Sequence, residues 1–178
     1  MNDQYDFANA KNAGDSYFTP FWCFEGLEQF IDFTKYKTAF DPSIGDGRLI
    51  FEWLEGKFDI VCDGRDLAWK DETGEEEDFL NWDGYSDLII SNPPFSLAQK
   101  FIEHALPRCD TLIFLLRLNF LGSQKRHKFW KANPPDKLIV LSKRPSFDGK
   151  GTDNNDYAWY VWQNKEKRIP SGVEWMMP

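Results

Sequence analysis

Short runs of apolar, β-prone residues alternate with amphipathic stretches along the chain. In one stretch the apolar residues recur at the three- and four-residue steps of a helix face, at Phe24, Leu27, Phe30 and Ile31. This alternation predicts an α/β domain with a mostly parallel sheet. The predicted strands are Thr38–Phe40, Asp59–Cys62, a weak one at Phe79–Leu80, Asp87–Ser91, Thr111–Leu116, Lys137–Leu141 and Tyr157–Trp162. The predicted helices are Phe21–Phe33, Gly47–Glu55, Ser96–Leu106 and Ser123–Lys131.

The composition is that of one folded domain. The chain has 178 residues, of which 42% are apolar and 17% are aromatic, so it can bury a core and is too apolar to be disordered. It contains no internal repeat or low-complexity linker, and we expect a single domain over residues 1–178. A long loop without a helix signal precedes the last strand, which can therefore enter the sheet antiparallel.

Cysteine usage and hydropathy exclude further classes of protein. The three cysteines are isolated in the sequence, which favours reduced thiols in a cytoplasm-like compartment and offers no metal-ligand spacing. The longest apolar run, Leu112–Leu116, is too short to cross a membrane, and the polar first residues do not resemble a secretory signal. We therefore expect a cytoplasmic protein without a membrane span or a bound metal.

Charge changes this picture because it is unevenly distributed. The formal net charge of −8 argues by itself against a nucleic-acid partner. Residues 1–89 carry 7 Lys/Arg and 21 Asp/Glu, whereas residues 90–178 carry 14 and 8, so the halves have net charges of −14 and +6. The second half either offers phosphates a positive side or is simply a solvated basic face. The first candidates for contacts with a nucleic-acid backbone are Lys125, Arg126, Lys128, Lys143 and Arg144.

An acidic turn with spaced glycines follows the first predicted strand. The strand ends at Asp41, Gly45 and Gly47 follow, and an amphipathic helix begins. Glycine allows close approach of a ligand, and such loops bind ligands at the carboxyl ends of strands in doubly wound sheets. A dinucleotide fingerprint needs glycine where Ile50 stands, and the Gly-Lys-Ser/Thr of a phosphate-binding loop is absent. The acidic residue favours a cationic ligand. A plain surface turn is the alternative.

The second motif is Ser91-Asn92-Pro93-Pro94-Phe95, directly after a predicted strand. The two prolines fix the backbone and donate no N–H group. The side-chain oxygen of Asn92 and the carbonyl of Pro93 can then accept hydrogen bonds at one place, next to the aromatic face of Phe95. This combination suits an exocyclic amino group on a planar ring. The alternative is a rigid turn with a core phenylalanine.

Together the two motifs resemble those of the S-adenosylmethionine (SAM)-dependent adenine-N6 DNA methyltransferases. The resemblance extends over roughly residues 15–162. It implies a Rossmann-like class I methyltransferase fold, which has a seven-stranded, mostly parallel sheet with a C-terminal antiparallel strand. It also implies SAM as the cofactor.

The resemblance assigns cofactor contacts to several segments. Tyr17–Pro20 is similar to the family's Thr-Pro segment, which contacts the methionine carboxylate. Asp63, with Asp66 as a weaker alternative, matches the acidic residue that holds the ribose. Asp78 and Phe79 are similar to the family's Asp-Phe pair, in which Asp accepts from the amine of the cofactor's adenine and Phe packs on its ring. The implied cofactor-binding residues are Tyr17, Thr19, Pro20, Asp41, Pro42, Ser43, Gly45, Gly47, Asp63, Asp78, Phe79 and Asn92.

The resemblance also assigns the catalytic loop to Asn92, Pro93, Pro94 and Phe95, and it places Phe147 as a second aromatic against the target base. Family members usually carry a separate target-recognition domain after the catalytic one. Few residues follow the last predicted strand, so we expect no such domain here. Either the enzyme reads little sequence or a partner protein supplies specificity.

The sequence therefore predicts methyl transfer from SAM to N6 of adenine in DNA, with the target base flipped out of the duplex. A bacterial cell or a phage-infected host is a plausible setting. RNA adenine methylation is the nearest alternative. Protein glutamine methylation and a non-catalytic nucleic-acid-binding clamp are further alternatives.

Overall fold

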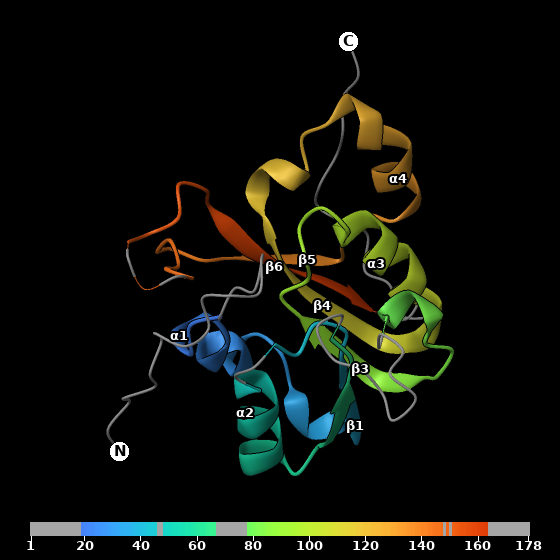
Figure 1. The fold of residues 1–178 in the computed structure, drawn as a ribbon, viewed down its shortest axis with the longest axis vertical. Helices are drawn as coiled ribbons and strands as arrows, with labels where there is room; N and C mark the ends of the chain where they lie inside the picture. The colour runs from blue at the N-terminus through green and yellow to red at the C-terminus, as the bar shows by residue number, and fades with distance from the viewer. Residues whose placement is uncertain (1–18, 46–47, 67–77, 148, 150, 164–178) are drawn as a thin grey trace.

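Six strands form one sheet in the part of the chain that the structure describes. The structure is a computed structural model, and it describes residues 19–45, 48–66, 78–147, 149 and 151–163. The strand order is β2-β1-β3-β4-β6-β5 (Figure 1). Strands β1 to β4 are mutually parallel, and β6 pairs antiparallel with both β4 and β5. The strands are β1 (Thr38–Asp41), β2 (Val61–Gly64), β3 (Ser86–Ser91), β4 (Cys109–Arg117), β5 (Lys137–Val140) and β6 (Tyr157–Gln163).

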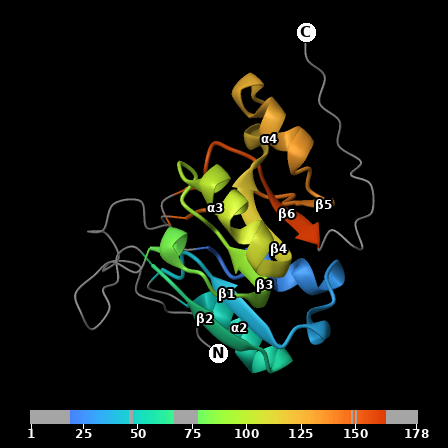
Figure 2. The ribbon, with the colours of Figure 1, turned by 90° about the vertical axis from the view of Figure 1, so that its right-hand side faces the viewer.

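Helices cover both faces of the sheet (Figures 1 and 2). Helices α1 and α2 pack with Leu88 and Ile90 on one face, and α3 and α4 pack with Ile89 on the other. Because both faces are buried, the apolar stretches Leu88–Ile90 in β3 and Leu112–Leu116 in β4 are continuous rather than alternating. The α-helices are α1 (Trp22–Glu25), α2 (Leu49–Phe58), α3 (Ala98–Ala105) and α4 (His127–Ala132). The 3₁₀ helices are η1 (Gly26–Gln29), η2 (Phe33–Lys35), η3 (Phe79–Asn81), η4 (Leu106–Arg108), η5 (Leu118–Phe120) and η6 (Gln124–Arg126).

The predicted helix over residues 21–33 is wrong as one continuous element. The structure has α1 followed directly by η1, and a second 3₁₀ turn begins after Asp32, whose carboxylate accepts from the Thr34 N–H at 3.1 Å. This cap satisfies a free N–H group and starts a new turn. Phe30, predicted on the buried face, is 53% exposed, and Phe33 is buried instead.

The weak strand predicted at Phe79–Leu80 is also wrong, since these residues lie in η3. The Asp78 carboxylate accepts from the Leu80 N–H at 2.9 Å and caps this 3₁₀ helix. The expected seven-stranded sheet is therefore not confirmed, because the described residues form six strands. The predicted antiparallel last strand is confirmed by the pairing of β6 with β4. Strand β2 begins later than predicted because Asp59 takes a left-handed φ of 55° at the end of α2.

The expectations about the cysteines and about a membrane span can be compared with the structure. Cys23, Cys62 and Cys109 are all free, and burial raises the pKa of each thiol to about 12, so each is a neutral thiol near pH 7. Within the described ranges, no helix combines the length and the apolar character needed to cross a membrane.

The tryptophans of β6 attach helical segments to the sheet through their indole N–H groups. Trp159 is fully buried, and its Nε1 donates to the Cys23 carbonyl in α1 at 2.6 Å. Trp162 donates in the same way to the Asn133 carbonyl after α4 at 3.1 Å. Each bond gives the indole N–H group of a buried tryptophan a partner.

We expect Trp159→Phe to lower the free energy of unfolding by about 2–4 kcal/mol, because it leaves the Cys23 carbonyl unsatisfied and a void beside it. Urea denaturation measures this change. Trp22→Phe is the matched control, since Trp22 is 37% exposed and we expect a change below about 0.5 kcal/mol. Equal destabilisation by the two substitutions would contradict the anchoring role of Trp159.

Candidate active site

The two sequence motifs meet at the carboxyl edge of the sheet. Strands β1 and β3 are parallel neighbours, with Phe40 opposite Ile89. The next residues along these strands lead to Asp41 on β1 and Ser91 on β3, which lie close together. The glycine-spaced turn and the Asn-Pro-Pro-Phe loop therefore leave the sheet side by side, at the edge where doubly wound sheets bind ligands.

Asp41 is the buried acidic residue of this edge. It is 3% exposed, and its Oδ1 accepts from the Ser43 N–H at 2.9 Å. Burial raises the pKa of Asp41 to about 7, although the nearby Ser91 hydroxyl and the Ser43 N–H both act to lower it. The Ser91 hydroxyl does not reach full hydrogen-bond geometry with the carboxylate. A cation bound near Asp41 would favour its ionised form.

The turn after Asp41 is held in place by the segment after β2. Gly45 has a φ of 63°, a left-handed conformation that favours glycine, and its N–H donates to Asp66 Oδ2 at 2.8 Å. A Cβ on Gly64 would meet the Asp41 carbonyl at 2.3 Å, so only glycine fits there. Sequence reasoning missed Gly64, because its requirement comes from the neighbouring strand.

The two acidic residues considered for the ribose have different surroundings. Asp63, at the end of β2, has a side chain that is 70% exposed, with its Oδ1 3.7 Å from the Arg65 guanidinium. The Asp66 carboxylate instead positions the turn through its bond from Gly45. Asp63 is thus the more accessible acceptor of the two, and its role toward the ribose stays a prediction.

Phe79 is not placed as the resemblance implied. It is 1% exposed and lies among Phe40, Phe101 and His104, with ring centroids 5.9, 5.1 and 4.9 Å away. Its ring therefore belongs to the core and presents no open face to an adenine. Of the other implied cofactor residues, Thr19, Pro20 and Pro42 are described and partly or fully buried, whereas Tyr17 and Gly47 lie outside the described residues.

The Asn-Pro-Pro-Phe loop carries buried acceptors without partners. Among the described residues, neither the side-chain oxygen of Asn92 nor the hydroxyl of Ser91 has a hydrogen-bond partner, although both atoms are buried. The Pro94 carbonyl accepts from the Leu97 N–H at 2.9 Å and so leads the loop into α3. A buried acceptor left unpaired costs about 1–3 kcal/mol, which a ligand that donates N–H groups can offset.

Tyr157 connects the two aromatic residues predicted against the target base. The Phe95 ring is partly buried and lies 5.6 Å from the Tyr157 ring. The Phe147 ring is 5% exposed and packs edge-on against Tyr157 at 5.2 Å. The structure thus brings Phe95 and Phe147 together, with Phe147 in the core rather than open to a ligand.

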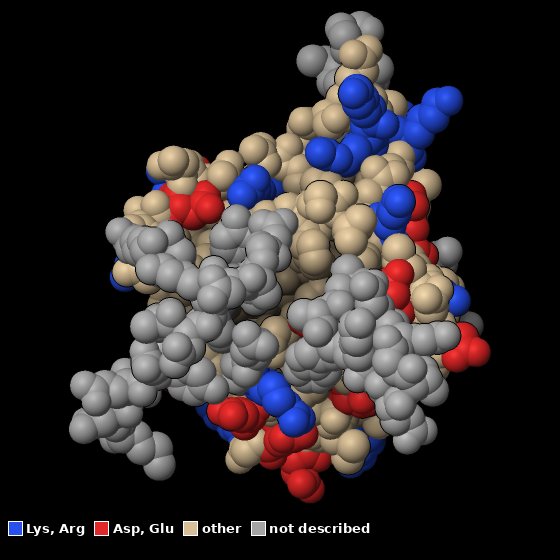
Figure 3. All heavy atoms as spheres, viewed as in Figure 1, with Lys and Arg blue, Asp and Glu red and all other residues tan. Residues whose placement is uncertain are grey.

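The five predicted backbone-binding cations fall into two groups. Lys125 in η6 and Lys128 in α4 are exposed, in the region where blue spheres gather in Figure 3. The other three each contact a partner in the protein, although Lys143 and Arg144 are also exposed. Arg126 donates to the Phe120 carbonyl at 2.8 Å and covers its ring, Lys143 lies 5.7 Å from the Trp22 ring, and Arg144 pairs with Asp156 at 2.8 Å.

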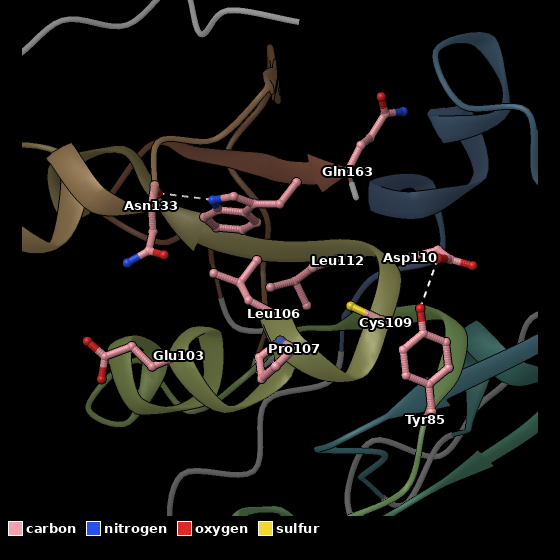
Figure 4. A pocket seen from close by; sticks show the side chains of 10 residues that line it. Tyr85, Glu103, Leu106, Pro107, Cys109, Asp110, Leu112, Asn133 and Gln163 are labelled. Atoms are coloured by element: carbon pink, nitrogen blue, oxygen red, sulfur yellow. Dashed lines mark hydrogen bonds between the residues drawn. The ribbon is translucent and has the colours of Figure 1, made fainter. Parts of the chain in front are cut away.

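A cavity of about 470 Å³ lies elsewhere, at the amino-terminal end of β4 (Figure 4). Cys109, Leu112 and Trp162 line it, and at its rim the Tyr85 hydroxyl donates to Asp110 Oδ1 at 2.8 Å. No predicted site residue borders this cavity. It is therefore separate from the candidate active site.

Comparisons with known proteins support the fold. No protein-family model matches the sequence, and no curated protein matches it. A solved class I SAM-dependent methyltransferase from Listeria monocytogenes matches 86% of this chain with a TM-score of 0.56 and 19% identity. The type I restriction-modification methyltransferase subunit from Streptococcus thermophilus matches 84%, with a TM-score of 0.60 and 14% identity. The fold is that of a class I methyltransferase.

A third structure bears on the cofactor. An RNA methyltransferase from Salinibacter ruber, solved with S-adenosylhomocysteine, matches 88% of this chain and 99% of its own, with a TM-score of 0.54 and 13% identity. The Salinibacter protein thus holds S-adenosylhomocysteine, the product of SAM-dependent methyl transfer, in a similar fold. The chain spans only 60% and 45% of the Listeria and Streptococcus proteins. At these identities the likeness concerns the fold, so the substrate must be argued from the site itself.

The raised pKa of Asp41 predicts a pH-dependent stability. The folded protein holds the Asp41 proton up to about pH 7, whereas the unfolded chain loses it near 3.8. Ionisation of the unfolded chain therefore lowers the free energy of unfolding as the pH rises. The expected decrease is on the order of 2–3 kcal/mol between about pH 5 and about pH 8. Asp41→Asn removes this contribution. Denaturant unfolding of both proteins across this range measures it, and identical pH slopes would show that Asp41 is ionised in the fold.

Proposed function

We propose that this protein transfers a methyl group from SAM to the N6 amino group of adenine in DNA. The observation that carries the proposal is the buried side-chain oxygen of Asn92 at the carboxyl end of β3, which has no hydrogen-bond partner in the part of the chain that the structure describes. An adenine amine has two N–H groups, and this oxygen and the Pro93 carbonyl can each accept one. The partly buried ring of Phe95, two residues after Pro93, can stack on the base.

The proposed mechanism relies on position rather than on a strong base. SAM, when bound, supplies an electrophilic methyl group on its sulfonium. Asn92 and Pro93 would accept the two N–H groups and favour the pyramidal amine, whose nitrogen could then displace neutral S-adenosylhomocysteine in line. The methylated amine would lose its extra proton to water, because no side chain in the loop is a strong base. Holding the reactants in place can contribute about 7–11 kcal/mol in favourable cases, and fixed acceptors in a buried site add to this.

The proposed cofactor site lies around the turn between β1 and α2. Asp41 fixes the turn through the Ser43 N–H, and Gly45 provides the close backbone approach. The exposed Asp63 is the proposed acceptor for the ribose hydroxyls. Burial of Asp41 beside this turn favours a cationic methionine moiety, because a nearby positive charge stabilises the ionised carboxylate.

The exposed Lys125 and Lys128 suit the phosphates of a nucleic acid. DNA is favoured over RNA because the two motifs together resemble those of the DNA enzymes. RNA is the second candidate, since the RNA methyltransferase from Salinibacter ruber is matched over 99% of its length. We propose that one domain carries the activity and that it either reads little sequence or relies on a partner protein for specificity. Glutamine methylation and a non-catalytic clamp are further outcomes that the experiment below distinguishes.

Methyl-labelled SAM should transfer label to N6 of adenine in duplex DNA incubated with the protein. Parallel incubations contain single-stranded DNA, RNA and a protein extract, and the modified product is identified by mass spectrometry. Label confined to RNA adenine would favour the second candidate. Label only on protein, or cofactor binding without any transfer, would overturn the assignment to nucleic-acid methylation.

We expect Asn92→Ala to lower kcat by about 10²-fold, as loss of one preorganised group in a buried site does. The Kd of SAM, measured by calorimetry, should change by less than about threefold, since the change removes the acceptor and not the cofactor turn. Asn133→Ala is the matched control, because Asn133 lies after α4 and borders the separate cavity. An unchanged kcat in Asn92→Ala would contradict the acceptor role.

The double variant Lys125→Ala/Lys128→Ala should weaken DNA binding and reduce the slope of log K against log salt by about one for each phosphate that the protein no longer neutralises. The control, Lys35→Ala/Lys57→Ala, removes the same charge from residues of η2 and α2. Fluorescence anisotropy at several salt concentrations measures both. Equal slopes in the two double variants would show that the residues beside α4 do not bind phosphates.

A further inference from the structure

Arg117 is fixed at the end of β4, next to the proposed catalytic loop. It pairs in register with Tyr157, the first residue of β6. Its Nε donates to the Tyr157 hydroxyl at 3.1 Å, and its own carbonyl accepts from the Tyr160 hydroxyl at 3.0 Å. Backbone pairing and side-chain bonds therefore hold Arg117 in one orientation.

The guanidinium of Arg117 lies over the ring of Phe95, 4.5 Å from its centroid. Cations are attracted to the face of an aromatic ring, and the planar guanidinium also stacks on it. The Tyr157 ring contacts the same phenylalanine at an interplanar angle of 44°. Pro93 and Pro94 fix the backbone before Phe95 but leave its side-chain torsions free. Arg117 and Tyr157 supply the constraint that the prolines do not.

Tyr157 extends this constraint to the loop after β5. Its ring packs edge-on against Phe147. Its hydroxyl lies near the Asp153 carboxyl. Burial acts to raise the pKa of this carboxyl, but the hydrogen bonds from Asn155 outweigh burial and lower the pKa. Tyr157 and Arg117 also act to lower it. Phe95 and Phe147 thus share one aromatic partner.

The contact between Arg117 and Phe95 is not required by the fold. Pairing of β4 with β6 runs from Thr111 to Arg117, and the sheet retains its backbone hydrogen bonds when one side chain at its end is shortened. Leu115 and Leu116, just before Arg117, are fully buried and hold this end of the strand. A change confined to the Arg117 side chain therefore tests its effect on Phe95 rather than the fold.

We propose that Arg117 and Tyr157 are positioning residues that set the orientation of the Phe95 ring for stacking on the target adenine. This inference rests on the proposed function. Arg117 acts through Phe95, and the Tyr157 hydroxyl acts through Arg117. Neither side chain takes part in methyl transfer itself.

The test is a double-mutant cycle with Arg117→Met and Tyr157→Phe, measured with an oligonucleotide that the wild-type protein methylates. Arg117→Met should lower kcat by about tenfold and Tyr157→Phe by a smaller factor. The double variant should be no slower than Arg117→Met, because the hydroxyl acts only through the guanidinium. The Kd of SAM should stay within about twofold, since the cofactor turn is untouched.

A spectroscopic measurement separates positioning from a general structural defect. 2-Aminopurine at the target position reports base flipping by its fluorescence, and we expect Arg117→Met to reduce the increase on binding. Arg117→Lys, which keeps the charge but not the planar fork, should restore only part of the loss. Arg108→Met is the matched control, because Arg108 precedes β4 at the far end of the sheet and donates to the His104 carbonyl.

The outcomes distinguish this inference from the proposed function. If the wild-type protein methylates adenine but Arg117→Met keeps kcat and the fluorescence change within about twofold, the positioning role is wrong and the proposed function stands. Additive effects of the two substitutions would overturn the link through Tyr157. If the wild-type protein methylates no adenine, the proposed function fails. A crystal structure of Arg117→Met then still decides whether Phe95 turns when the guanidinium is removed.

Discussion

The candidate site depends on the parallel pairing of β1 with β3 in the middle of the sheet. Phe40 lies opposite Ile89, so the chain leaves both strands at the same edge, through Asp41 on one and Asn92 on the other. A shift of one residue in either strand would turn its side chains to the opposite face. The register is secured because helices pack against both faces of these strands, so a shift would exchange the side chains that fill the two cores.

Burial gives the polar groups at this edge their chemical character. Asp41 is nearly inaccessible to solvent, and burial outweighs the hydrogen bond that favours its charge. The Asn92 oxygen is buried without a partner among the described residues. Both groups cost stability in the free protein, and both are satisfied by ligands of the proposed kind, a cation and an amine. Low local polarity strengthens each of those interactions.

The sequence allowed the strands and both motif loops to be predicted, because apolar β-prone runs and proline-glycine turns act over a few residues. Prediction from the sequence failed where a local hydrogen bond or a tertiary contact outweighs the apolar pattern. The Phe79–Leu80 dipeptide looks like a short strand, but the Asp78 carboxylate caps a 3₁₀ helix there. Periodicity placed Phe30 in the core, but the helix ends before it and Phe33 is buried instead.

The sequence by itself determined the chemistry of the Asn-Pro-Pro-Phe loop, because the amide and the proline rings fix their acceptors and backbone locally. Only the tertiary structure decided which residues support it. Arg117 and Tyr157 are 40 positions apart and meet at Phe95 because antiparallel pairing places them opposite each other. Gly64 likewise faces the Asp41 carbonyl only through the pairing of β1 with β2. The pattern of apolar and polar residues along the chain does not specify the register between strands, since the register is set by packing across the whole sheet.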